Sequence, residues 1–337
     1  PIGRYDQLEK QLESGGHVNV PRAFLLMLWG LFKKMVVADR ALAAVCAVFD
    51  VPGGTWGGAM AVVGVLAYSV QQYCDFSGGI DLVAGIAELF GIRLAENFRR
   101  PYFAVSLGDF WRRWHISLGA WMRDYVFYPF ALCKPVARLS KAAKGRFGAA
   151  FARALPAALG NILVFTLVGV WHGATSNYIL WGLYNGVILA LTALLEPRVK
   201  RMNERCPRLT GSRGFHVFRV LRTFIIVNIG WYFDRNEFVQ GCIYLRNTFT
   251  DFNLSALAAN APGAFAAVSG PAWGLVIIST LLVFAHSVLK EQGRDPYAEV
   301  QRLPLALRWG LYYLVIFMVL LSFICVNETV GFLYANF

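Results

Sequence analysis

The chain contains a long segment, residues 154–195, without a single Asp, Glu, Lys or Arg. A bilayer core takes about 20 apolar residues per helix, so this segment is long enough for two crossings. Its one titratable side chain of note is His172, in the stretch Gly169-Val170-Trp171-His172-Gly173. An ionisable group at membrane depth is costly unless it faces a protein interior or a wet cavity, and it therefore marks a functional-site hypothesis. The alternative is a structural histidine whose polar atoms are satisfied.

The composition extends this pattern to the whole chain. Hydrophobic residues make up 57% of the sequence and the mean hydropathy is +0.49, whereas soluble domains hold roughly 45–50% apolar residues. The sequence therefore predicts an all-α, polytopic integral membrane protein. The other expected spans are residues 51–74, 273–289 within the uncharged stretch 252–289, and 309–327, with a charge-interrupted helix at 23–49 and a shorter one at 215–233.

The net charge of +12 comes from basic loops beside apolar segments. Residues 134–153 hold six basic side chains and no acidic one, and residues 196–222 hold eight basic and two acidic ones. The positive-inside rule places such loops in the cytoplasm. The segment 154–195 is then an outward hairpin, residues 290–308 give a weaker signal for the cytoplasmic side, and residues 331–337 lie outside. We expect no nucleic-acid partner, and we expect residues 134–153 to be a solvated linker.

The cysteines and the other histidines form no recognisable pattern. None of the six cysteines belongs to a CxxC pair, so we expect packing residues rather than a metal site or a disulfide framework. His17, His216 and His286 have no supporting motif, and we treat them as incidental.

Residues 93–128 are too charged to cross a membrane and too aromatic for a free loop. Trp and Arg together favour the membrane interface, which predicts an interfacial amphipathic helix here. The aromatic and apolar residues at helical spacing are Trp111, Trp114, Leu118 and Trp121, with Arg112, Arg113 and Arg123 on other faces.

Six motifs follow one another in order along the chain. They are Asp75-Phe76-Ser77-Gly78 with Asp81; Glu96-Asn97-Phe98 with Arg100-Pro101-Tyr102; Asp109-Phe110-Trp111-Arg112-Arg113-Trp114-His115-Ile116-Ser117-Leu118; Trp121-Met122-Arg123-Asp124-Tyr125; Trp171-His172-Gly173; and Leu180-Trp181-Gly182. Together they resemble the membrane-bound O-acyltransferase family, in particular its bacterial branch of alginate O-acetylation proteins and teichoic-acid D-alanyl transferases. Gly79-Ile80 replaces the commoner Tyr-Ser of that family.

The resemblance implies a ring of tilted helices around a central tunnel, with amphipathic interfacial helices. It implies one membrane-embedded acyltransferase domain over residues 1–337, which lacks further helices on its N-terminal side. An acyl donor would enter from the cytosol and a hydroxyl acceptor from the other face. The family's catalytic histidine corresponds to His172, and its second polar position corresponds to His115.

The chemistry of these residues suits such a reaction. Acyl transfer from a thioester needs a base for the hydroxyl and donors for the developing oxyanion. His172 is a suitable base, because burial disfavours the imidazolium cation, and Gly173 permits close approach of a substrate. Trp171 would line the tunnel, and His115 would either orient a substrate or polarise the acyl carbonyl. No obvious covalent nucleophile accompanies the histidines, so direct transfer to the acceptor is expected.

Further candidates for substrate contact or the tunnel wall have structural alternatives. Arg112 and Arg113 would contact substrate or anchor lipid headgroups, and Trp114 belongs to the same segment. Asp109 would line the site, or it would pair or cap helices. Asp75 and Asp81 would pair or cap helices rather than act as ligands. Asn161 lies three helical turns before His172 and would face the same interior or pair helices.

Transfer of a short acyl group, with acetyl preferred, onto an exported or cell-envelope polysaccharide is the leading hypothesis. The protein would be a multi-pass component of a bacterial plasma membrane. Acetyl-CoA or another thioester would be the donor, no cofactor would be bound, and an extracytoplasmic SGNH-type acyltransferase would be a partner. The alternative is D-alanyl transfer to teichoic acid from a small acyl carrier protein. A polar-solute transporter would instead need buried charge pairs and an internal repeat, neither of which is evident.

Overall fold

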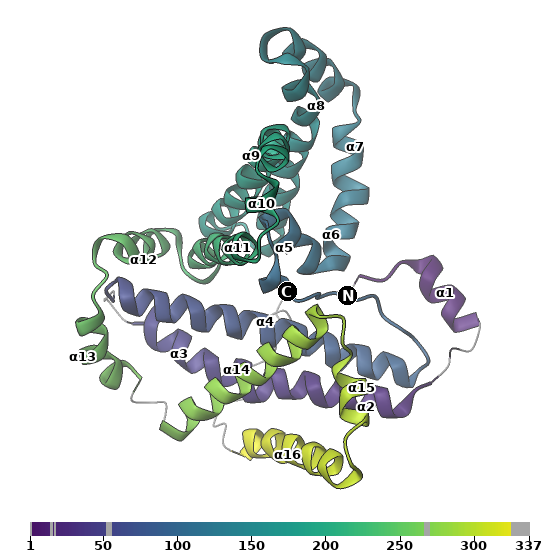
Figure 1. The fold of residues 1–337 in the computed structure, drawn as a ribbon, viewed down its shortest axis with the longest axis vertical. Coiled ribbons are helices and arrows are strands. Elements are labelled where there is room, and N and C mark those ends of the chain that lie inside the picture. The colour runs from purple at the N-terminus through teal and green to yellow at the C-terminus, as the bar shows by residue number, and fades with distance from the viewer. Residues whose placement is uncertain (1, 14–15, 17, 52–55, 266–269, 325–337) are drawn as a thin grey trace. The chain divides into compact units, whose positions relative to one another are not determined.

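The computed structural model describes residues 2–324, apart from 14–15, 17 and the two stretches 52–55 and 266–269. All the regular elements in this described part are helices (Figure 1). The chain divides into two compact units. One comprises residues 3–100 and 243 onward, and the other comprises residue 2 with 101–242. The expectation of a single domain stays a prediction.

Four helices within the described residues are long and apolar enough to cross a membrane, in agreement with the membrane-protein prediction. They are α8 (Lys134–His172), α9 (Ser176–Arg205), α14 (Gly270–Glu291) from Trp273 onward and α16 (Leu305–Ile324) up to Phe323. The expected segment 154–195 therefore forms parts of two such helices. The expected spans 23–49 and 215–233 are helical and 51–74 is helical from Gly58 onward, but none of the three is among these four. Charged residues interrupt the apolar runs of 23–49 and 215–233, and polar residues interrupt that of 51–74.

In the first unit, one continuous helical stretch packs along a single long helix. The stretch comprises α2 (Val20–Leu31), the π-helix η1 (Phe32–Ala38) and α3 (Asp39–Phe49), and it packs against α4 (Gly58–Leu89). A Cβ atom on Gly30 would lie 2.6 Å from the carbonyl oxygen of Gly78. The two backbones can approach so closely only because neither residue has a side chain.

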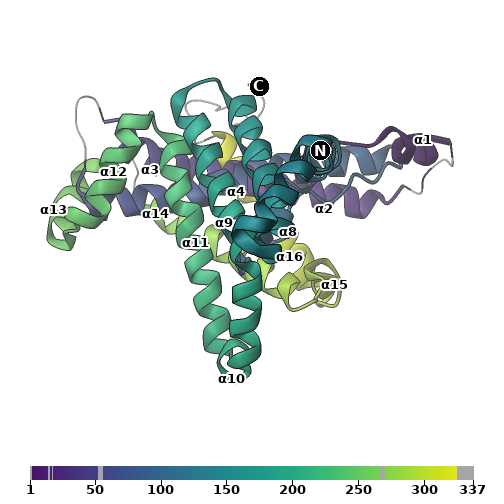
Figure 2. The same cartoon turned by 90° about the horizontal axis from the view of Figure 1, so that it is seen from above.

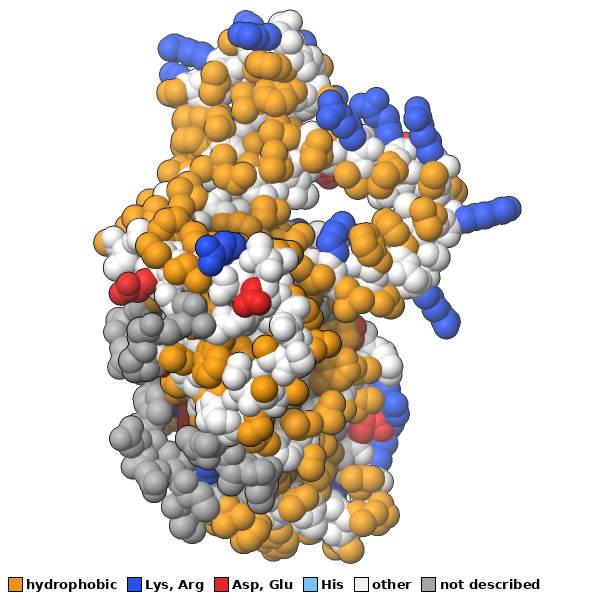
Figure 3. Space-filling model, turned by 90° about the vertical axis from the view of Figure 1, so that its left-hand side faces the viewer, with side chains coloured by type: hydrophobic (Ala, Val, Ile, Leu, Met, Phe, Trp, Pro, Cys, Tyr) orange, Lys and Arg blue, Asp and Glu red, His pale blue; other side chains and the backbone are white. Residues whose placement is uncertain are grey.

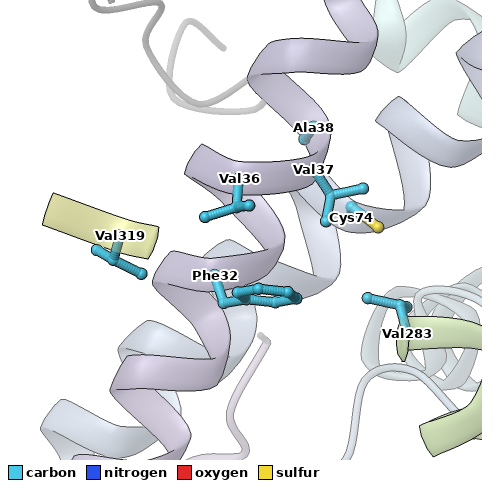
Figure 4. Close-up of a cluster of buried hydrophobic side chains, with 7 residues drawn as sticks. All are labelled: Phe32, Val36, Val37, Ala38, Cys74, Val283 and Val319. Carbon is cyan, nitrogen blue, oxygen red and sulfur yellow. The ribbon is translucent and has the colours of Figure 1, made fainter. Parts of the chain in front are cut away.

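A hydrophobic cluster centred on η1 joins α14 and α16 to this pair (Figure 4). Val283 comes from α14, Val319 from α16 and Cys74 from α4. The remaining members are Phe32, Val36, Val37 and Ala38. The other helices outside residues 101–237 are α1 (Tyr5–Glu13), α12 (Phe238–Thr250), α13 (Leu254–Ala264) and α15 (Pro296–Gln301).

Two buried lysines in η1 pair with carboxylates of α4 and α3. The Lys34 ammonium lies 2.5 Å from Asp75 and 2.8 Å from Asp39. The Lys33 ammonium lies 2.8 Å from Asp81 and donates a 2.8 Å hydrogen bond to Ser77. The expectation that Asp75 and Asp81 pair helices is thereby confirmed.

In the second unit, α8 and α9 form an antiparallel hairpin, and α11 (Arg213–Arg235) packs beside α9 (Figures 1 and 2). The short helix α5 (Leu107–Arg113) contacts both α9 and α11. The other short elements are η2 (Pro101–Phe103), α6 (Ile116–Met122), η3 (Arg123–Phe127), α7 (Tyr128–Ala131) and α10 (Pro207–Thr210).

The two basic stretches are largely helical, so the linker prediction for residues 134–153 is wrong. Helix α8 begins at Lys134 and is interrupted at Gly148, whose φ is +83°. Ala, Lys, Arg and Leu favour a helix, and Pro135 fits its first turn. Residues 196–222 form the end of α9, α10 and the start of α11. Figure 3 shows Lys and Arg gathered at these helix ends, beyond a hydrophobic flank.

Residues 93–128 do not form the single amphipathic helix that the spacing predicts. The helix breaks between α5 and α6 at Trp114 and His115. His115 has φ +47° and ψ +52°, a left-handed conformation that ends regular α-helix geometry. The break separates Trp114, which is 3% exposed, from Trp121, which is 40% exposed. The expected outward placement of residues 331–337 concerns residues outside the described part.

We expect Lys34→Met to lower the free energy of unfolding by about 3 kcal/mol, because it removes the nearest cation from buried Asp75. Adding Asp75→Leu should recover part of this loss. The exposed Lys10→Met is the matched control and should leave stability unchanged. Circular dichroism monitors unfolding in detergent for wild type, Lys34→Met, the double variant and the control. Equal stability of Lys34→Met and the control would contradict a stabilising role of the pair.

Candidate active site

The turn that carries His172 depends on a close crossing of α8 and α9. A Cβ atom on Gly182 would lie 2.3 Å from the carbonyl oxygen of Phe165, and one on Gly169 would lie 2.4 Å from that of Tyr178. A side chain at either position would therefore force α8 and α9 apart. Small residues at a helix interface allow this approach. The crossing brings the C-terminal end of α8 against the first turns of α9.

His172 is the last residue of α8 and is surrounded by aromatic rings. Its ring centroid lies 4.8 Å from that of Trp171, 5.3 Å from that of Trp181 and 5.9 Å from that of Tyr178. Trp181 meets the imidazole at 78°, whereas Tyr178 stacks on it at 24°. Gly173 follows, and a Cβ atom there would lie 2.7 Å from the Tyr178 ring. This glycine thus leaves the space that Tyr178 occupies beside His172.

His115 approaches the same place from the break between α5 and α6. Its ring centroid lies 6.5 Å from that of Trp171, which therefore contacts both histidines. The left-handed backbone at His115 is costly for a residue with a Cβ atom. A strained backbone conformation persists only where the surrounding structure enforces it, and such conformations are often found at functional sites. Trp171 is itself 48% exposed, so this face of the cluster is open.

Burial lowers the pKa of His115 to about 3, and the neighbouring His172 acts in the same direction. The His115 imidazole is therefore neutral throughout the physiological pH range. In this form one ring nitrogen is a donor and the other an acceptor. His115 can thus donate a hydrogen bond without carrying a charge.

Asp109 is a helix-capping residue in this structure. It lies in the first turn of α5, where the Ser106 hydroxyl accepts from its amide at 3.1 Å and its carboxylate accepts from the Val105 amide at 3.1 Å. Arg113 lies 3.2 Å and Arg112 lies 3.5 Å from the Asp109 carboxylate. This arrangement resembles a capping box, except that the Asp109 carboxylate accepts from Val105, the residue before the N-cap, and not from the N-cap Ser106 itself. Asp109 and Arg113 thereby hold α5, while the Arg112 side chain is 72% exposed.

Trp114 lies in the core rather than on an open wall. It stacks on Phe110 at 5.5 Å and meets Trp231 of α11 at 5.5 Å. Asn161 is also apart from the cluster, because 11 residues of helix separate it from His172 by about 16 Å of axis. A Cβ atom on Gly186 would lie 3.2 Å from the Asn161 carbonyl oxygen, which places Asn161 at the helix crossing. The structure therefore brings together His172, His115, Trp171 and Gly173 but not Asn161.

Tyr178 is a neighbour of His172 that the sequence motifs do not predict, and Trp181 is predicted only as part of a motif. Both lie within nine residues of His172, beyond the turn that joins α8 to α9. Helical spacing across a tight antiparallel turn would have suggested them. No group of three or more His, Cys, Asp or Glu in the described residues is arranged to hold a metal ion.

The sequence profile of the membrane-bound O-acyltransferase family matches residues 5–229, which include both histidines. The chain belongs to the membrane-bound O-acyltransferase family. It is 31% identical over 305 residues to the probable alginate O-acetylase AlgI of Pseudomonas syringae, covering 89% of this chain and 53% of the relative.

Two other membrane-bound O-acyltransferase relatives carry different names. The Helicobacter pylori peptidoglycan O-acetyltransferase is 30% identical, over 67% of this chain and 38% of its own length. The Bacillus subtilis teichoic acid D-alanyltransferase is 32% identical, over 49% of this chain and 38% of its own length. The chain thus spans about half the length, or less, of these curated relatives.

Gly182→Ala should lower the free energy of unfolding by about 2 kcal/mol, because its Cβ atom would meet the Phe165 carbonyl and force α8 and α9 apart. Gly145→Ala is the matched control, since it lies in a helix with nothing within 4 Å of its Cβ position. That control should gain about 0.5–1 kcal/mol from helix propensity. Unfolding curves of equal midpoint would contradict the close crossing.

The conformation of His115 predicts an unusual order of stability. His115→Gly should be more stable than His115→Ala by about 1 kcal/mol, because only glycine adopts a left-handed backbone without a Cβ penalty. In a regular helix the order is reversed. Chemical unfolding of the two variants gives the difference directly. Greater stability of the alanine variant would contradict the left-handed conformation.

Proposed function

We propose that the whole protein is an integral-membrane O-acyltransferase that moves a short acyl group, preferably acetyl, onto hydroxyls of an exported or cell-envelope polysaccharide. The observation that carries this proposal is the pairing of His172 and His115 around Trp171, within a chain of this family. The names of the alginate and peptidoglycan O-acetylating relatives support acetyl and a polysaccharide acceptor. We place the protein in a bacterial plasma membrane, as a multi-pass protein around a tunnel.

His172 acts as the general base in this proposal. The acceptor hydroxyl gives its proton to the neutral imidazole while its oxygen attacks the acyl carbonyl carbon. The carbon–sulfur bond of the thioester then breaks, and the leaving thiolate takes the proton back from the imidazolium. The acyl group therefore passes directly to the acceptor, without a covalent acyl-enzyme.

His115 assists as a neutral group. It either donates a hydrogen bond to the acyl carbonyl as negative charge develops there or orients the substrate. Its left-handed backbone sets the direction in which the side chain leaves the main chain, which contributes to the preorganisation that such a role requires. Trp171 contacts both rings, and we propose that it lines the approach to both.

The donor in this proposal is acetyl-CoA or another cytosolic acyl thioester, which acts as a substrate rather than a bound cofactor. An extracytoplasmic SGNH-type acyltransferase is a proposed partner protein. No nucleic acid is involved, because the basic side chains gather at the ends of apolar helices.

D-alanyl transfer to teichoic acid is the second candidate. The similarity to the Bacillus subtilis D-alanyltransferase supports it. A small acidic carrier protein would then deliver the acyl group, and the basic ends of α8, α9 and α11 would attract it.

Replacing His172 by Ala in the full-length protein should abolish acetyl esters on the cell-envelope polysaccharide, because no base then accepts the hydroxyl proton. His216→Ala is the matched control, since His216 is an exposed histidine of α11. Acetyl released by mild alkali and normalised to polysaccharide and to membrane expression is the measurement.

Normal acetylation in the His172→Ala strain would refute the acetyl-transfer proposal. Loss of D-alanyl ester with intact acetyl would instead establish the second candidate. Loss of acetyl esters in both His172→Ala and the control His216→Ala, at equal expression, would mean that the effect is not specific to His172.

A further inference from the structure

Asn185 is a buried amide in the apolar part of α9, and the proposed chemistry does not use it. Its exposed fraction is 3%. Burying an amide among apolar groups is costly unless hydrogen bonds satisfy it. Both ends of this side chain are satisfied: Nδ2 donates to the Trp181 carbonyl at 2.9 Å, and Oδ1 accepts from Trp111 Nε1 at 3.2 Å.

These two bonds connect α9 to α5. The bond to Trp181 lies within α9, one turn back, and fixes the orientation of the Asn185 amide. The remaining oxygen then meets the indole N–H of Trp111 on α5. A buried indole N–H needs such an acceptor, so the bond sets where the Trp111 ring lies.

The Trp111 ring is two aromatic contacts away from His172. It meets Trp181 edge-on, with centroids 5.6 Å apart and planes at 86°. Trp181 in turn meets His172 at 5.3 Å and 78°. Trp181 is 2% exposed, so it has no free space into which to move. Close-packed interiors transmit such displacements from ring to ring.

We infer that Asn185 is a positioning residue for His172. It holds Trp111, which holds Trp181, which supports one edge of the imidazole. Asn185 touches Trp111 and Trp181 and acts on His172 only through these rings. This inference rests on the proposed function for its kinetic readout, but the placement of His172 can also be measured without turnover.

A purely structural role in joining α5 to α9 is the competing explanation. Asn236 offers a matched control, because its Nδ2 donates to the Tyr232 carbonyl at 3.0 Å, the same one-turn bond. It is 6% exposed and lies at the C-terminal end of α11. A comparison of Asn236→Leu with Asn185→Leu therefore separates the effect of losing a buried asparagine from the effect of losing the hydrogen bond to Trp111.

The experiment uses the full-length protein in lipid nanodiscs with acetyl-CoA as donor and cell-envelope polysaccharide as acceptor. Release of the CoA thiol gives kcat and KM for wild type, Asn185→Leu, Trp111→Phe, their double variant, Asn236→Leu and His172→Ala. Leucine is similar to asparagine in size, and phenylalanine keeps a ring while removing the donor. Thermal unfolding of each protein is measured alongside.

Both single changes at the Trp111–Asn185 bond should lower kcat at least about tenfold, since a misplacement of roughly 1 Å can cost about 100-fold. KM for acetyl-CoA should stay within about threefold, because neither residue touches the donor. The double variant should match the more affected single variant, and Asn236→Leu should match wild type. Unchanged kcat in Asn185→Leu, or multiplied losses in the double variant, would overturn the inference.

Carbethoxylation of His172 by diethyl pyrocarbonate, followed by mass spectrometry of its peptide, tests the position without turnover. Asn185→Leu and Trp111→Phe should each change the His172 rate at least about threefold, and Asn236→Leu should not. If wild type releases no CoA thiol, the proposed function fails while this measurement still decides the inference. Equal rates in all four proteins would overturn it.

Discussion

The close crossing of α8 and α9 is the constraint on which the candidate site depends. Glycines at 169 and 182 let the two backbones touch, so the turn after His172 is short and its geometry is fixed. That turn brings two residues of α9, Tyr178 and Trp181, onto the imidazole. In an apolar solvent, where no hydrophobic force drives helices together, such packing must supply the precision of the site.

The break between α5 and α6 contributes the second half of the site. A continuous helix through residues 107–122 would carry its aromatic stripe along one face. The left-handed residue His115 instead separates α5, held by its N-cap Ser106 and by Asp109, from α6. The imidazole of His115 then lies 6.5 Å from the ring of Trp171, which also contacts His172. Backbone strain is thus placed at the residue whose orientation matters to the proposed chemistry.

The sequence predicted the helical membrane fold and the two histidines because both have local signals. Uninterrupted apolar runs reveal α8, α9, α14 and α16. The linker expectation for residues 134–153 is wrong although their own composition suits a helix. Other features depend on tertiary context, which local patterns do not contain. The spacing of residues 107–122 does not predict a left-handed residue. The hydrogen-bond partner of Asn185 is Trp111, which is 74 residues away in the sequence.

Direct transfer from thioester to hydroxyl is the central chemical claim, and the fate of a labelled acyl group tests it most directly. Inverted membrane vesicles containing the full-length protein would receive radiolabelled acetyl-CoA, and polysaccharide and protein would be separated after denaturing quench at successive times. Direct transfer predicts label on the polysaccharide from the first turnover and none bound covalently to this polypeptide. Label that appears first on the polypeptide and then moves to polysaccharide would contradict it.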